Sequence, residues 1–89
     1  MEGYLNKYVN FIYGFKRRYF RLQGDVLLYY KSEKATHPKD SFFLPQCSIG
    51  ISQKDPLKVL IKDNNKTLDI RTANLTEKVL WFNALNKAA

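Results

Sequence analysis

Cysteine, histidine and glycine are scarce in this chain of 89 residues, and each shortage excludes a kind of site. The single Cys47 cannot form an internal disulfide, which favours a reducing compartment. With His37 as the one histidine, a zinc site of four cysteines, or of cysteines and histidines, cannot be built. The four glycines are dispersed at positions 3, 14, 24 and 50, so no glycine-rich phosphate loop exists.

Long apolar runs and catalytic groupings are missing too. No apolar stretch approaches the roughly 20 residues of a membrane span, and no secretory signal opens the chain. The eight acidic residues are scattered without a paired-carboxylate pattern, His37 lies in a polar segment, and Cys47 has no nearby partner in sequence. We therefore expect a protein that is not an enzyme and that has no metal or cofactor.

Positive charge is abundant and unevenly distributed. The chain carries 15 Lys and Arg against eight Asp and Glu, a formal charge of +7, and most of the excess lies in residues 1–39. Such a concentration favours an anionic partner, either nucleic acid, an acidic protein or an anionic membrane. The alternative is a basic surface that only keeps the chain soluble.

Seven short runs rich in aromatic and β-branched residues predict antiparallel strands. They cover residues 3–9, 15–23, 25–32, 41–44, 47–52, 57–62 and 67–72. In the final segment, Trp81, Leu85 and Ala88 follow helical spacing, and Asn74 with Glu77 fits an N-terminal capping box. These elements predict one mainly β domain over residues 1–89, a barrel or sandwich of two packed sheets with a C-terminal helix.

Three cations in the first predicted hairpin occupy unusual positions. Alternation places Lys7 on the face of Leu5, and Lys16 and Arg18 on the face of Phe20. A regular hairpin sets Lys7 opposite Lys16, and like charges across a strand pair are destabilising. Cations that converge at the mouth of a barrel are best explained by a bound anion, although long side chains that reach solvent with nothing bound would explain them as well.

An apolar run links these two strands in the 9–14 loop. Phe11, Ile12 and Tyr13 stand between Asn10 and Gly14. They either fold back onto the body as a minor core or project as a hydrophobic wedge beside the cations. Together, an inserted apolar side chain and several cations could hold a small domain at an anionic membrane.

The chain resembles a pleckstrin homology (PH) domain over all 89 residues. The resemblance rests on "EGYLNKY" in the first strand, "FKRRYFRL" in the second, "LLYY" in the third and "WFNAL" in the helix. It is strongest for the subgroup of oxysterol-binding proteins, ceramide transfer protein and four-phosphate adaptor proteins, which share the Lys7-aromatic-x-Asn10-aromatic-aliphatic-x-Gly14-aromatic spacing. It implies the PH-type barrel and recognition of phosphatidylinositol 4-phosphate on Golgi or trans-Golgi membranes.

The resemblance also assigns residues. It implies that the phosphoinositide headgroup is bound by Lys7, Lys16, Arg18, Tyr29 and Lys39, and that the membrane is entered by Val9, Asn10, Phe11, Ile12 and Tyr13. Four positions depart from the subgroup: Lys16 replaces a common glutamine, Asp40 a common glycine, and Tyr8 and Tyr19 replace tryptophans. By the same resemblance we expect a cytoplasmic, peripheral-membrane module excised from a longer lipid-transfer protein, with an Arf-type small GTPase as a further partner.

Two other functions compete with this one. A single-stranded nucleic-acid-binding barrel would need aromatic residues spread over a sheet face, whereas the exposed candidates cluster in one loop, so nucleic acid is not expected. A PH-like module that binds only proteins is the stronger alternative. The predicted helix shows no spare apolar face for an obligate dimer, so a monomer is expected.

Overall fold

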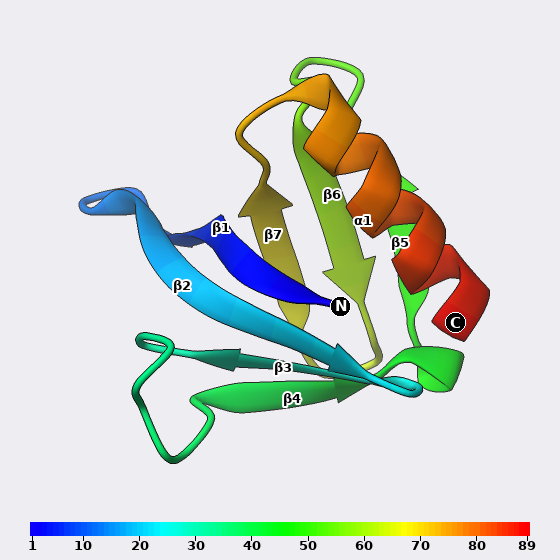
Figure 1. The fold of residues 1–89 in the computed structure, drawn as a ribbon. Coiled ribbons are helices and arrows are strands. Elements are labelled where there is room, and N and C mark those ends of the chain that lie inside the picture. Colours follow the sequence, from blue (N-terminus) through cyan, green and yellow to red (C-terminus); the bar gives the residue numbers. More distant parts are fainter.

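Seven strands, a short 3-10 helix and one α-helix make up the computed structural model, which describes residues 1–89 (Figure 1). The strands are β1 (Glu2–Asn10), β2 (Gly14–Gln23), β3 (Val26–Tyr30), β4 (Asp40–Phe43), β5 (Ser48–Ile51), β6 (Lys58–Lys62) and β7 (Thr67–Arg71). The 3-10 helix covers Leu44–Gln46, where Pro45 interrupts the strands, and α1 covers Leu75–Ala88. Every predicted element is present, with boundaries that differ by one or two residues.

All seven strands belong to one antiparallel sheet in the order β4-β3-β2-β1-β7-β6-β5. The two predicted packed sheets are therefore two halves of a continuous sheet. The halves are joined weakly, because β1 pairs with β7 only at Asn6↔Arg71 and Lys7↔Ile70. By contrast, β1 pairs with β2 along almost its whole length.

The core fills the space between the sheet and α1. It contains eleven buried apolar residues, among them Phe20, Leu27 and Ile61 from the strands and Trp81 and Leu85 from the helix. The helix begins after Asn74, whose Oδ1 accepts a hydrogen bond from the Glu77 amide at 2.9 Å. This is the predicted cap, and it satisfies one of the amides that a helix N-terminus leaves unpaired.

Another part of α1 differs from the prediction. Leu75, Val79 and Leu80 are 58%, 49% and 56% exposed, and they border a surface hollow of about 370 Å³. The interpretation that the helix has no spare apolar face is therefore wrong. The monomeric state stays a prediction. No helix of the structure combines the length and apolarity needed to cross a bilayer.

The outer face of β1, β2 and β3 carries a second cluster of aromatic rings. Tyr19 and Tyr30 are buried there, and the Tyr4 ring meets the Tyr19 ring edge-on with centroids 4.9 Å apart. The Tyr19 hydroxyl donates to Glu2 Oε1 at 2.6 Å, a hydrogen bond that, with burial and the carboxylate charge, raises the pKa of Tyr19 to about 12. Arg17 lies on this face, with its guanidinium carbon 3.8 Å from the centre of the Tyr4 ring. Cation–π contact with Tyr4 therefore holds Arg17 on the outer face.

Candidate functional site

The β1–β2 hairpin has the register expected from the sequence, with Lys7 directly opposite Lys16. Lys7 is half-buried while Lys16 is exposed. The Lys7 ammonium donates to the Tyr8 carbonyl at 3.1 Å and lies 5.4 Å from the centre of the Tyr29 ring. Lys7 thus points across the mouth of the sheet toward β3.

The local charges around Lys7 are mostly positive. Burial is the main cause that lowers the pKa of Lys7 below its usual 10.5, and the charges of Arg18 and Lys39 lower it further. Asp40 is the one carboxylate that raises it. A bound phosphate would relieve this crowding, because an opposite charge favours the protonated ammonium.

Arg18 is the second half-buried cation of the mouth. Its Nη1 donates to the Arg17 carbonyl at 2.9 Å, which leaves the rest of its guanidinium free for another acceptor. Neither Arg18 nor Lys7 belongs to any of the four ion pairs of the structure. Two cations without carboxylate partners are therefore available on the core-facing side of β1 and β2.

Tyr29 contributes to both the core and the mouth. Its ring packs against Phe20, with centroids 5.4 Å apart. Burial and then the charge of Asp40 raise the pKa of Tyr29, whereas Arg18 and Lys66 act to lower it. Its hydroxyl makes no hydrogen bond in the structure, so it remains a possible donor to a ligand.

The other two predicted phosphate ligands lie nearer the edge of the mouth. The Lys16 ammonium lies 5.5 Å from the centre of the Tyr13 ring, which places it toward the β1–β2 turn. Lys39 is exposed, and its amide donates to the Tyr29 carbonyl at 2.8 Å. That backbone bond brings the end of the β3–β4 loop beside the centre of the candidate site.

The β1–β2 turn presents its apolar residues to solvent. Phe11 is 88% exposed, Ile12 70% and Tyr13 63%, while Val9 is 39% exposed. The alternative that this run folds back onto the body is wrong. In Figure 1 the turn projects at the left, away from α1.

Two flanking residues hold this turn in shape. Asn10 Oδ1 accepts hydrogen bonds from the Ile12 and Tyr13 amides at 3.0 and 2.9 Å. Gly14 has a φ of +65°, a left-handed conformation that glycine adopts without steric cost. The side chain of Asn10, predicted to enter the membrane, is therefore bonded to the backbone of the turn, as asparagine commonly is.

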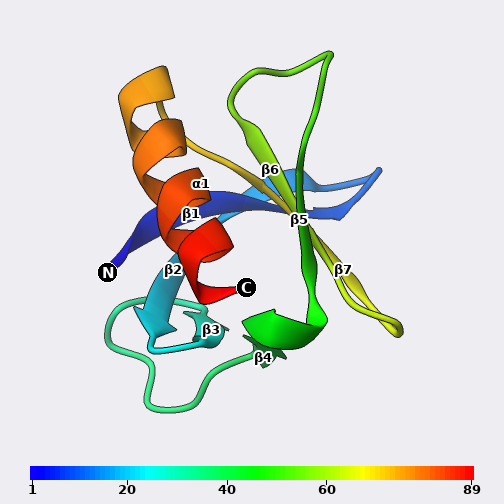
Figure 2. The ribbon, with the colours of Figure 1, turned by 90° about the vertical axis from the view of Figure 1, so that its right-hand side faces the viewer.

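Lys66 also reaches the mouth, and the sequence does not predict it. It lies in the β6–β7 turn, and its ammonium lies 2.7 Å from Asp40 Oδ1. Figure 2 shows this turn and the β1–β2 turn on the same side of the molecule, the side opposite α1. Distance in sequence conceals this contact, because it depends on how the sheet bends.

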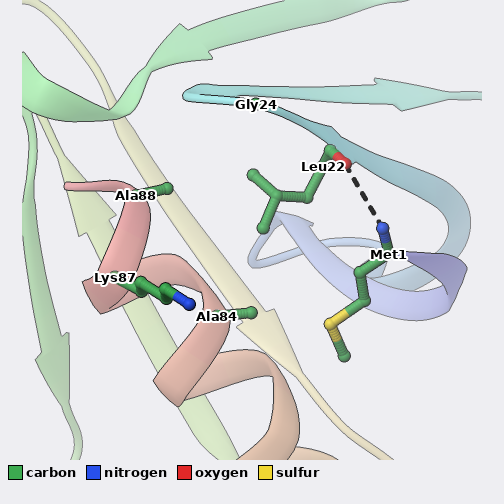
Figure 3. Close-up of a pocket in the computed structure, with 6 residues that line it drawn as sticks. All are labelled: Met1, Leu22, Gly24, Ala84, Lys87 and Ala88. Atoms are coloured by element: carbon green, nitrogen blue, oxygen red, sulfur yellow. Dashed lines mark hydrogen bonds between the residues drawn. The ribbon is translucent and has the colours of Figure 1, made fainter.

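The candidate site is open and shallow. None of the three surface hollows is lined by a residue predicted to bind the headgroup. The hollow in Figure 3, of about 410 Å³, lies between the end of β2 and the last turns of α1, where the Met1 amino group donates to the Leu22 carbonyl at 3.3 Å. Its one charged side chain, that of Lys87, does not make an anion site comparable with the mouth.

Comparison with known families identifies this arrangement. The family model for the PH domain matches residues 1–89. The chain belongs to the PH domain family. PH domains are in general non-catalytic binding modules, as expected from the lack of catalytic groupings in the sequence.

Relatives of this PH domain include larger proteins. It is 30% identical over 94 residues to human oxysterol-binding protein-related protein 10, a match that covers 100% of this chain and 12% of the relative. It is 34% identical over 91 residues to pleckstrin homology domain-containing family A member 8 of Danio rerio, covering 99% of this chain and 17% of the relative. The chain thus spans less than a fifth of the length of either relative.

Solved structures agree with the fold. The PH domain of human oxysterol binding protein-related protein 11 superposes with a TM-score of 0.90 at 24% identity, covering 99% of this chain and 78% of that one. The C-terminal PH domain of pleckstrin, in complex with D-myo-Ins(1,2,3,5,6)P5, superposes with a TM-score of 0.84 at 23% identity, covering 99% and 92%. At these identities the superpositions establish the PH fold.

Proposed function

We propose that this PH domain binds a phosphoinositide headgroup and thereby attaches to an anionic membrane. Lys7 and Arg18 bind phosphate through charge-assisted hydrogen bonds, with Tyr29 as a further donor. Lys16 and Lys39 add positive charge at the edge of the site. Meanwhile Phe11, Ile12 and Tyr13 enter the bilayer beside the headgroup.

The observation that carries the proposal is the exposed apolar turn beside the basic mouth. Soluble domains have little reason to expose consecutive residues such as Phe11 and Ile12 at 88% and 70%. Insertion of each into lipid contributes about 1.5–3 kcal/mol when burial is complete. Cations near an anionic surface add about 1 kcal/mol each. Together these contributions favour a membrane over a soluble anion as the natural ligand.

Phosphatidylinositol 4-phosphate is the proposed lipid. The proposal rests on the resemblance of the Lys7, Asn10 and Gly14 spacing to the oxysterol-binding protein subgroup, and the chain is 30% identical to one oxysterol-binding protein-related protein. By the same resemblance, we place the domain on Golgi or trans-Golgi membranes, inside a longer lipid-transfer protein that works as a monomer in the cytoplasm. An Arf-type small GTPase is a proposed second partner.

Protein binding without lipid affinity is the second candidate. The exposed apolar residues of α1, Leu75, Val79 and Leu80, favour it, because apolar side chains grouped beside a surface hollow are typical of interaction sites. They lie on an element remote from the β1–β2 turn, so a protein bound there would not need the proposed membrane surface (Figure 2).

Vesicle sedimentation tests the proposal. The domain is mixed with phosphatidylcholine vesicles that carry one phosphoinositide at a time, and with phosphatidylserine vesicles of equal charge as the control. We expect strong co-sedimentation with phosphatidylinositol 4-phosphate and weak co-sedimentation with phosphatidylserine. Equal binding to both would reduce the site to a general basic surface, and binding to neither would favour the protein-interaction role. An RNA gel shift run in parallel should show no complex.

A further inference from the structure

An ion pair crosses the basic mouth and links two distant parts of the chain. The Lys66 ammonium lies 2.7 Å from Asp40 Oδ1 and also donates to the Ser41 carbonyl. The same ammonium lies 4.3 Å from the centre of the Phe42 ring. Three contacts on β4 therefore restrain one lysine side chain from the β6–β7 turn.

Both partners of this pair are held by their own backbone surroundings. Asp63 Oδ1 accepts hydrogen bonds from the Asn65 and Lys66 amides, each at 2.8 Å, which shapes the turn that carries Lys66. Asp40 is the first residue of β4, and its Oδ1 accepts from the Ser41 amide at 2.8 Å. The pair is thus more ordered than the usual surface ion pair between two long, free side chains.

Asp40 faces the residues proposed to bind phosphate. It is the register partner of Tyr29, and neighbours across strands present their side chains on the same face. Its negative charge raises the pKa of both Tyr29 and Lys7. Its place opposite Tyr29 in the sheet therefore makes Asp40 the carboxylate that a bound headgroup would meet.

We propose that Asp40, with Lys66 as its counter-ion, is a specificity-determining residue that favours a headgroup with few phosphate groups. This inference rests on the proposed phosphoinositide function. A fixed carboxylate repels each phosphate in proportion to its charge, so a headgroup with more phosphates is penalised more strongly. Lys66 offsets part of this repulsion and limits the penalty for the least charged headgroup. Lys16 adds a cation that could accept a second phosphate and therefore favours the more phosphorylated headgroup. Asp40 acts in the opposite direction.

Titration calorimetry with soluble headgroups tests the proposal without a bilayer. The two probes are D-myo-inositol 1,4-bisphosphate and D-myo-inositol 1,4,5-trisphosphate, the headgroups of the mono- and bisphosphorylated lipids. Asp40→Asn keeps an oxygen that accepts from the Ser41 amide and removes the charge. We expect trisphosphate affinity to rise on the order of tenfold and bisphosphate affinity by a smaller factor. Selectivity therefore shifts toward the more charged probe.

Matched variants separate this local effect from a change in net charge. Asp25→Asn alters the net charge equally but lies in the β2–β3 turn, at the other end of β2, so it should leave the affinity ratio unchanged. Lys66→Met leaves Asp40 without its counter-ion and should weaken both probes, whereas Lys87→Met on α1 should not. The double variant Asp40→Asn with Lys66→Met should bind more tightly than Lys66→Met alone. Melting temperatures of all variants identify any loss of fold.

The outcomes distinguish this inference from the proposed function. If the wild-type domain binds and Asp40→Asn has the same affinity ratio as Asp25→Asn, the inference is overturned and the proposed function stands. If the wild type binds neither probe and Asp40→Asn binds both, Asp40 blocks the site for every headgroup, which contradicts the selectivity role and the proposed function together. Absence of binding by every variant refutes both.

Discussion

Arg17 and Arg18 are consecutive residues of β2 that lie on opposite faces of the sheet. Arg17 stacks on Tyr4 on the outer face, 3.8 Å from the ring centre. Arg18 lies on the inner side, where its charge acts on Lys7 and Tyr29. Strand alternation separates the two guanidinium groups, although they carry the same charge at nearly the same place in the chain. Substitution of Arg18 therefore tests the inner-face site, and the same substitution of Arg17 is its control.

The first prediction is that the inner cations bind the headgroup. Arg18→Ala or Lys7→Ala should weaken binding to phosphoinositide vesicles roughly tenfold to a hundredfold, because each charge-assisted hydrogen bond contributes about 1.5–3 kcal/mol. Arg17→Ala removes the same charge from the outer face and should reduce binding much less. Vesicle sedimentation measures all three. If Arg17→Ala and Arg18→Ala lose binding equally, the mouth is not the site.

The second prediction separates insertion from headgroup binding. Changing Phe11 and Ile12 to Ser should leave the affinity for soluble inositol phosphate nearly unchanged, because the cations remain. Affinity for vesicles with the same headgroup should fall more than tenfold, since the inserted apolar surface is lost. The same double change at Val79 and Leu80 of α1 is the matched control and should leave vesicle binding intact.

Thermal melts check that the turn variant remains folded. Phe11 and Ile12 are largely exposed, so their replacement should change the free energy of unfolding by no more than about 0.5 kcal/mol. A melting temperature lowered by ten degrees or more, roughly 2 kcal/mol for a domain of this size, would show that the turn packs inward in solution.

The third prediction concerns Gly14. Its φ of +65° disfavours any residue with a Cβ, so Gly14→Ala should destabilise the fold by about 1–2 kcal/mol. A fall of about 4–8 °C per kcal/mol is expected in the melting temperature. Gly3→Ala is the control: Gly3 has no positive φ, and a Cβ there meets no atom within 4 Å. Equal melting temperatures for both variants would contradict the strain argument.

The fourth prediction is a loss of stability in acid through Asp55. Its carboxylate accepts from Arg71 Nε at 2.8 Å and from the Leu57 amide, and these bonds lower its pKa below the ordinary 3.8. A lowered pKa in the folded state means that the unfolded chain binds the proton more tightly. The stabilisation is therefore complete well above pH 3.8 and is lost as pH falls through the lowered pKa.

Melting temperatures measured from neutral pH to pH 2 test the direction of this pH dependence. Wild type should be more stable than Asp55→Asn at neutral pH, and the difference should shrink below about pH 4 as the wild-type carboxylate protonates. Asp25→Asn removes a carboxylate that has no ion-pair partner and should differ from wild type by a small, nearly constant amount. If the difference in melting temperature between wild type and Asp55→Asn instead grew as pH falls, the Asp55 carboxylate would not be the group that loses stabilisation in acid.

Local patterns predicted most of this fold. Strand alternation, turn residues and the Asn74 cap depend on neighbours in sequence, so the strands, the helix and the Lys7–Lys16 register followed from them. The contact between Asp40 and Lys66 did not, because 26 residues separate the partners and the bending of the sheet brings them together. The exposed face of α1 was missed because helical spacing identified the buried side through Trp81 and Leu85 without counting the apolar residues left over.

The β1–β2 turn owes its shape to Asn10 and Gly14, while the three side chains at its tip make no contact with the core. The residues that shape the turn are thus different from the residues that the turn exposes. If the turn enters a bilayer as proposed, mutations at 11–13 should change the depth of insertion with little effect on folding. Under the proposed function, these three positions can therefore be varied to tune how long the domain stays on a membrane without redesigning the fold.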